Sequence, residues 1–223
     1  MKNLIVVGDS FCVNVGWPQE LARLLDLNLL VGGFGGQHWW SYRHFLNRTL
    51  ESKDIVNTEV MVFVHTFTER IPNLNPKIAL CNQFDKNPKT ELGKAVQLYY
   101  KHLSNTLYAE WAQQQWFKEI KEKYSNKIKT IHLHAFPGTW ADRDLLGGMQ
   151  VSPNLSSISL DEIANKDFFL PYDTRDNHLS KKNNKTLAEE LARLYRNYSQ
   201  RDETLDISKF DLKSTKWIKE HSQ

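Results

Sequence analysis

Apolar residues occur along the chain in short continuous runs, and these runs alternate with longer stretches of helical spacing. Four runs have the length and unbroken apolar character of strands buried on both faces of a sheet: 4–7, 27–31, 60–64 and 128–133. Helical spacing covers four other stretches: 17–25, 39–50, 91–124 with a bend near Asn105, and 180–198 with Ser180 as its N-terminal cap. Strands that alternate with helices predict an α/β fold. We expect a three-layer α/β/α sandwich with a mostly parallel, flavodoxin-like central sheet of about four or five strands.

The remaining segments predict loops and a tail. Residues 66–89 are polar with several prolines, and residues 135–174 are rich in Pro, Gly, Asn and Ser, so both segments are expected to be mostly loop. Residues 1–199 are expected to form one domain, and 200–223 a charged tail. A short helix near 212–218 is compatible with the pattern of the tail.

Composition and charge narrow the class of protein. The chain has 223 residues, of which 40% are hydrophobic and 25% charged, as in a soluble globular protein. The net charge is only +3 and no dense basic block occurs, so neither a nucleic-acid nor a membrane partner is expected. The apolar run at residues 4–7 is too short for the hydrophobic region of a signal peptide. The two cysteines have neither the number nor the spacing of a disulfide framework or a metal site. These features favour a protein of the reducing cytoplasm, and they leave its oligomeric state open.

Candidate chemistry gathers where the predicted strands end. Ligands of parallel sheets bind at the carboxyl ends of the strands, so the segment from 8 to 12 and the segment before the last helix are expected to meet at one edge. The first carries Ser10, and the second carries His178 with Asp173 and Asp176 nearby. A serine hydroxyl becomes a nucleophile when a base such as histidine takes its proton, and a carboxylate orients that base. Asp176 is the favoured carboxylate, and Asp173 remains an alternative.

These residues carry a resemblance to a known family. The sequence Gly-Asp-Ser-Phe at 8–11 resembles block I of the SGNH, or GDSL-type, hydrolases, and Gly-Phe-Gly-Gly at 33–36 resembles block II. An Asp and a His before the last helix are also typical of that family, and the likeness in the order of parts covers nearly all of 1–199. The resemblance implies that Ser10 is the nucleophile, that His178 is the general base, and that the backbone N–H groups of Ser10 and Gly36 stabilise the oxyanion. It implies ester hydrolysis with no cofactor and no metal.

The chain departs from the family pattern at two places. Block III of the family supplies an Asn side chain to the oxyanion hole after the third strand, whereas this chain has Val-His-Thr-Phe-Thr-Glu-Arg at 64–70. Thr66, Thr68 and His65 are the candidates for that third donor. The usual Asp-x-x-His is replaced by the shorter Asp-Asn-His at 176–178, because residue 175 is Arg.

Several other residues have two interpretations each. Trp39 or Trp40 after the glycine loop, and Trp140, are candidates for an aromatic pocket wall that suits a sugar ring or an acyl group. Cys12 is expected to be buried packing, and Arg70 and Arg143 are either anion-binding or solvated surface residues. His132 and His134 share one face of the fourth strand, but no third metal ligand accompanies them.

The sequence therefore predicts a serine esterase whose substrate is a small-molecule or carbohydrate ester. An acyltransferase with the same acyl-enzyme is an alternative, because a sugar hydroxyl can replace water. A non-catalytic binding or structural protein is a second alternative, favoured by the missing block III Asn. A phosphohydrolase that uses Asp9, Asp176 and His178 around a metal is a third.

Overall fold

The computed structural model describes residues 1–12, 16–33, 35–36, 38–50, 53–72, 89–138, 142–159 and 178–212. Its centre is a six-stranded sheet in which every neighbouring pair of strands is parallel, in the order β2-β1-β3-β4-β5-β6. The strands are β1 (Asn3–Gly8), β2 (Asn28–Gly33), β3 (Thr58–His65), β4 (Lys129–His134), β5 (Met149–Ser152) and β6 (Glu203–Thr204).

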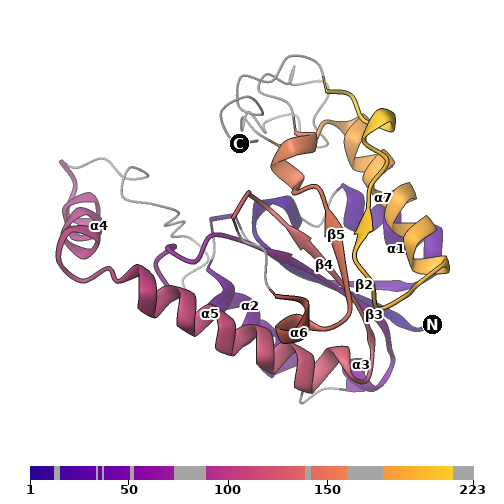
Figure 1. The fold of residues 1–223 in the computed structure, drawn as a ribbon, viewed down its shortest axis with the longest axis horizontal. Helices are drawn as coiled ribbons and strands as arrows, with labels where there is room; N and C mark the ends of the chain where they lie inside the picture. Colours follow the sequence, from indigo (N-terminus) through magenta and orange to yellow (C-terminus); the bar gives the residue numbers. More distant parts are fainter. Residues whose placement is uncertain are drawn as a thin grey trace.

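Helices cover both faces of this sheet, so the predicted three-layer α/β/α sandwich is confirmed (Figure 1). The helices are α1 (Trp17–Leu25), α2 (Trp39–Leu50), α3 (Lys53–Val56), α4 (Glu91–His102), α5 (Thr106–Ile120), α6 (Arg143–Leu146) and α7 (Lys181–Arg196). Shorter helical turns are η1 (Ser10–Cys12), η2 (Lys121–Ser125), η3 (Leu155–Ile158) and η5 (Ile207–Lys209). Helices α1 and α7 pack together on one face, and α2 and α5 cover the other, while α4 stands away from the sheet (Figure 1).

The unbroken apolar runs exist because each central strand is buried on both faces. In β1, Leu4 and Val6 belong to the core under α1 and α7, whereas Ile5 and Val7 belong to the core under α2 and α5. All four side chains are at most 1% exposed. Alternate residues of one strand therefore stabilise two separate hydrophobic layers.

The strand order places a crevice between β1 and β3. The order β2-β1-β3-β4-β5 is that of flavodoxin-like sheets, in which the connections after β1 and β3 leave toward opposite faces. In sheets of this order, ligands bind at the carboxyl ends of the two strands where the connections diverge. Residues Asp9 and Ser10 follow β1 at this point, and Thr66 follows β3.

Two features of the fold differ from the sequence-based expectation. The long helical pattern from 91 is two helices, because the side chain of Asn105 accepts a hydrogen bond from the N–H of Tyr108 and starts α5 afresh. Strand β5 was expected to be loop. It has only four residues and follows Gly147 and Gly148, both with positive φ. Its apolar pattern is therefore too short to be recognised as a strand beside these turn residues.

The segment after residue 199 contributes to the core, although it was expected to be a charged tail. Strand β6 pairs with β5, and Leu205 and Phe210 are buried in the layer of α1 and α7. Glu190 of α7 anchors this segment, since its carboxylate accepts from Lys209 and from the backbone N–H of Asp206. The helix considered near 212–218 lies outside the described residues.

We predict that replacing Glu190 by Gln destabilises the protein in a pH-dependent way. Burial alone would raise the pKa of Glu190, but hydrogen bonds from Arg193 and Lys209 outweigh it and lower the pKa from its usual 4.5 to about 2. The stabilisation from Glu190 is therefore complete above pH 4.5 and is lost as the pH falls toward 2. Urea unfolding should show that Glu190→Gln loses about 1–3 kcal/mol at pH 7. The gap between wild type and variant should narrow below pH 4.5, and a gap that stays constant with pH would contradict this assignment.

Candidate active site

Ser10 is held in a tight turn at the end of β1. The side chain of Asp9 accepts a hydrogen bond from the N–H of Phe11 at 3.1 Å, and its backbone carbonyl accepts from the N–H of Cys12 at 2.9 Å. These two bonds close the η1 turn directly after the strand. Ser10 is half-buried at the carboxyl edge of the sheet, whereas Phe11 and Cys12 point into the core. Aspartate and serine favour such turns because their side chains bond to nearby backbone.

The structure brings His178 to Ser10 across 168 positions of sequence. The distance from Nε2 of His178 to Oγ of Ser10 is 2.9 Å, so the hydroxyl can donate its proton to an unprotonated ring nitrogen. The imidazole also stacks on Phe11, with ring centroids 5.0 Å apart and 14° between the planes. This contact fixes the orientation of the base relative to the hydroxyl.

Asn184 ties the segment that carries His178 to the segment that follows Ser10. Its Oδ1 accepts from the backbone N–H of Trp17 at 2.9 Å, and its Nδ2 donates to the carbonyl of Leu179 at 2.9 Å. Gly16 lies against this amide with φ 129°, where a Cβ would come within 2.6 Å of Oδ1. The side chain of Ser180 caps α7 as expected, accepting from the N–H of Asn183. The starts of α1 and α7 are thereby joined beside the Ser10–His178 pair.

A buried ion pair lies behind Ser10. Nη1 of Arg70 is 3.1 Å from Oδ2 of Asp9, and the side chains are 4% and 0% exposed. The hydroxyl of Thr66 donates to the same oxygen at 3.0 Å. Arg70 was expected to bind an anionic substrate or to be solvated, but it is a buried partner of Asp9. Its guanidinium also lies 5.7 Å from the ring centroid of Phe136.

The glycine loop lies against the Ser10 turn. A Cβ on Gly33 would come within 2.5 Å of the carbonyl oxygen of Cys12, so only glycine allows β2 and η1 to approach this closely. A Cβ on Gly35 would be 3.8 Å from Cβ of Ser10. Gly36 is buried with φ 67°, in the left-handed region that favours glycine. Gly33 and Gly35 therefore lie against the turn that carries Ser10.

The other predicted site residues lie in different places relative to Ser10. The hydroxyl of Thr66 donates a hydrogen bond to Asp9, and Nε2 of His65 lies 3.1 Å from Nδ1 of His132. Both side chains therefore have hydrogen-bond partners other than Ser10. Thr68 lies farther along the same loop and lines a cavity. Asp173 and Asp176 lie outside the described residues, as does Trp140.

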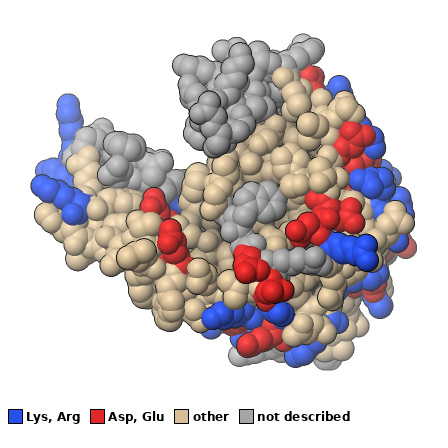
Figure 2. Space-filling view, in the orientation of Figure 1, with Lys and Arg blue, Asp and Glu red and all other residues tan. Residues whose placement is uncertain are grey.

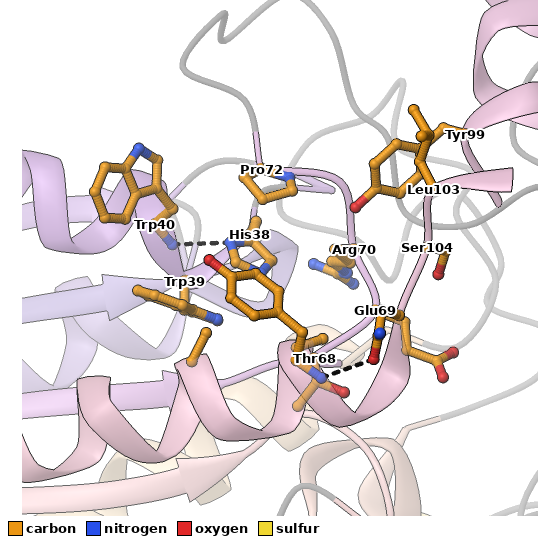
Figure 3. Close-up of a pocket in the computed structure, with 14 residues that line it drawn as sticks. His38, Trp39, Trp40, Thr68, Glu69, Arg70, Pro72, Tyr99, Leu103 and Ser104 are labelled. Atoms are coloured by element: carbon orange, nitrogen blue, oxygen red, sulfur yellow. Dashed lines mark hydrogen bonds between the residues drawn. The ribbon is translucent and has the colours of Figure 1, made fainter.

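The cavity lies beside the glycine loop and has a volume of about 370 Å³ (Figure 3). Its walls come from the start of α2, the loop after β3, and the turn between α4 and α5. Trp39 and Trp40, both considered as pocket walls, line it together with Arg70. Because Arg70 also binds Asp9, the cavity and the Ser10 turn share one residue.

The three histidines at the ends of β3 and β4 form a buried cluster. His65, His132 and His134 are each at most 3% exposed, and Nε2 of His134 lies 3.3 Å from Oε1 of Gln150. Burial, with the neighbouring histidines, holds the pKa values of His65 and His132 well below their usual range. Within the described ranges no group of three His, Cys, Asp or Glu side chains is arranged to hold a metal ion.

Cys12 is buried packing, as the sequence suggested. Its side chain is fully enclosed next to Gly8, and burial together with the charge of Asp9 raises the pKa of its thiol well above the usual range. A thiol in this state is a poor nucleophile.

Sequence reasoning missed three residues that shape the site: Phe11, Arg70 as a partner of Asp9, and Asn184. Phe11 directly follows Ser10, so its aromatic character was the only available signal. The contacts of Arg70 and Asn184 join distant segments and have no signature in local spacing.

Comparison of the chain with family models, with curated proteins and with solved structures finds no match. The class of protein therefore rests on the geometry of the site. Every helix in the described ranges is too short or too polar to cross a membrane.

We predict that Arg70→Met destabilises the protein by about 3–5 kcal/mol, because it leaves the carboxylate of Asp9 buried without its cationic partner. The double variant Asp9→Asn/Arg70→Met removes both charges and should recover a large part of the loss. Urea unfolding at pH 7 measures both. A double variant no more stable than Arg70→Met would mean that the unpaired charge is not the cause.

We also predict that stability falls as the pH drops below 6.5. Burial lowers the pKa of His38 to about 4, and it also lowers the pKa values of His65 and His132 well below their usual range. The unfolded chain binds protons at these rings near pH 6.5 and the folded chain does not, so acid favours unfolding. Each ring contributes up to about 1.4 kcal/mol per pH unit. Unfolding measured from pH 7.5 to 5.5 should show this slope, and His65→Gln should reduce it by about one proton. An unchanged slope in the variant would contradict the prediction.

Proposed function

We propose that this protein is a serine-dependent esterase of the SGNH type, which removes a small acyl group from an ester through an acyl-enzyme on Ser10. The observation that carries the proposal is the 2.9 Å contact between Oγ of Ser10 and Nε2 of His178 at the crevice between β1 and β3. A hydroxyl within hydrogen-bond reach of an oriented imidazole is the arrangement that activates a serine nucleophile.

In the proposed mechanism, Oγ of Ser10 attacks the acyl carbonyl while Nε2 of His178 takes the hydroxyl proton. The carbonyl oxygen gains the negative charge, and the backbone N–H groups of Ser10 and Gly36 stabilise it. The imidazolium then gives its proton to the leaving alcohol, and the ester bond breaks. Water attacks the acyl-enzyme with the same base, and the acid leaves as Ser10 recovers its proton.

Two features around the pair support this role. The stacking of His178 on Phe11 holds the plane of the imidazole while its Nε2 faces Oγ of Ser10. Asp176 is the proposed orienting carboxylate, with Asp173 as its alternative. The close approach of the glycine loop to Ser10 supports backbone donors, which need no side chain from block III.

The test is covalent labelling. Wild-type protein should react with an organophosphonate serine probe and hydrolyse p-nitrophenyl acetate. Ser10→Ala should lose the label, and its hydrolysis should fall by about 1,000-fold or more, because the nucleophile is gone. Mass spectrometry locates the label, and a steady-state assay measures hydrolysis.

Ser208→Ala is the matched control, since Ser208 is an exposed serine in η5 and far along the chain from the site. It should label and hydrolyse like wild type. His178→Asn should label much more slowly, because the base is absent. Labelling that persists in Ser10→Ala, or a folded wild type that never labels, would overturn the proposal.

A further inference from the structure

Four large aromatic side chains line the cavity that shares Arg70 with the Ser10 turn. Trp39 and Trp40 come from the start of α2, Tyr99 from α4 and Tyr108 from α5. Trp40 is 40% exposed and Tyr108 is 66% exposed. Large aromatic side chains usually bury most of their surface, so rings left open around a cavity of about 370 Å³ offer flat faces to a ligand.

Polar atoms stand among these rings. The indole nitrogen of Trp39 is buried and has no hydrogen-bond partner in the part of the chain that the structure describes, and the residue is only 8% exposed. Figure 3 shows that the edge of Trp39 carrying this nitrogen points toward the middle of the lining residues. A buried donor without an acceptor is unfavourable, and a ligand hydroxyl would satisfy it. The carboxylate of Glu69, already bonded to Thr106 at 3.1 Å, is a second polar group at the exposed rim.

The charges of the cavity lining leave no site for an anion. Arg70 is balanced by Asp9, and Glu69 adds a negative charge. Nδ1 of His38 accepts from the N–H of Trp40 at 3.1 Å, and burial lowers the pKa of this ring to about 4, so it is neutral at pH 7. Figure 2 shows acidic and basic side chains interspersed over the visible face. A phosphate or carboxylate would therefore find no unbalanced cation in the described lining.

We propose that this cavity binds the ring of a neutral saccharide. A sugar ring has faces of C–H groups that pack on aromatic rings, and its hydroxyls at the edge donate to carboxylates and accept from indole N–H groups. Trp40 and Tyr108 supply the faces, while Trp39 and Glu69 supply the polar partners. A fatty acyl chain would fill the volume but leave the Trp39 N–H unsatisfied.

This inference names the substrate class of the proposed esterase. It rests on the proposed function in one respect, namely that the sugar is the alcohol part of the ester. Gly35 borders Ser10, His38 lines the cavity two residues after Gly36, and Arg70 connects the Ser10 turn to the cavity. Binding of the sugar itself requires no catalysis.

The experiment measures binding of unesterified sugars to the full chain. The panel contains the methyl glycosides of glucose, galactose, mannose and N-acetylglucosamine, with their β-linked disaccharides. Decanoate and methyl glucuronide serve as acyl and anionic competitors. Saturation-transfer NMR reports contact, and titration gives the dissociation constant.

We expect at least one neutral glycoside to bind with a dissociation constant below 10 mM. Trp40→Ala and Tyr108→Ala should each weaken binding by about tenfold, because each removes one stacking face. Leu107→Ala is the matched control: Leu107 is 78% exposed on the same helix as Tyr108 but does not line the cavity. Its dissociation constant should stay within twofold of wild type.

Three results would overturn the inference: no binding by any neutral glycoside at 10 mM, equal weakening by Leu107→Ala, or tighter binding of decanoate or the glucuronide. The result is separable from the test of the esterase. Labelling of Ser10 without sugar binding rejects the cavity alone, whereas sugar binding without labelling rejects the esterase and leaves a saccharide-binding protein.

Discussion

The buried pair of Asp9 and Arg70 is the contact on which the geometry of the site depends. It joins the segment after β1 to the segment after β3 at the point where the two connections diverge. Two charges that have left water must stay paired, so neither loop can move far without the other. The nucleophile candidate is the residue after Asp9, and Arg70 itself forms part of the cavity. The pair therefore sets the position of Ser10 and of the ligand cavity together.

A row of aromatic rings beside the same region runs from the core at Phe11 to the surface at Phe67. Phe11 stacks on His178 and meets Phe136 edge to face, and Phe67 stacks on Phe136 with centroids 4.4 Å apart. Rings of this size have few rotatable bonds, so their packing orients an imidazole at low entropic cost. The stacked ring and the backbone link made by Asn184 both contribute to the orientation of His178.

The order of the main elements could be predicted from sequence because the continuous apolar runs mark the strands. The proximity of Ser10 and His178 could be predicted because parallel strands end at one edge of the sheet. Strand β5 could not, since its four residues carry too little pattern, and β6 depends on tertiary contacts of Leu205 and Phe210 rather than on its own two residues. Thr66 and His65 had the right chemistry and the right loop for oxyanion donors. Their side chains are engaged by Asp9 and His132, which no local spacing reveals. Pairing choices among buried polar groups are settled by long-range packing.

The link between the starts of α1 and α7 has a consequence for the order in which the molecule forms. The segments it joins lie near opposite ends of the chain, with Trp17 bonded to Asn184. A ribosome releases residue 10 long before residue 178, so a nascent chain holds the hydroxyl without its imidazole for most of synthesis. Contacts of such large sequence separation also form late in folding, because closing the intervening loop is entropically unfavourable. The Ser10–His178 pair is therefore complete only when the last helix has docked, and unfinished or truncated chains hold Ser10 without its imidazole partner.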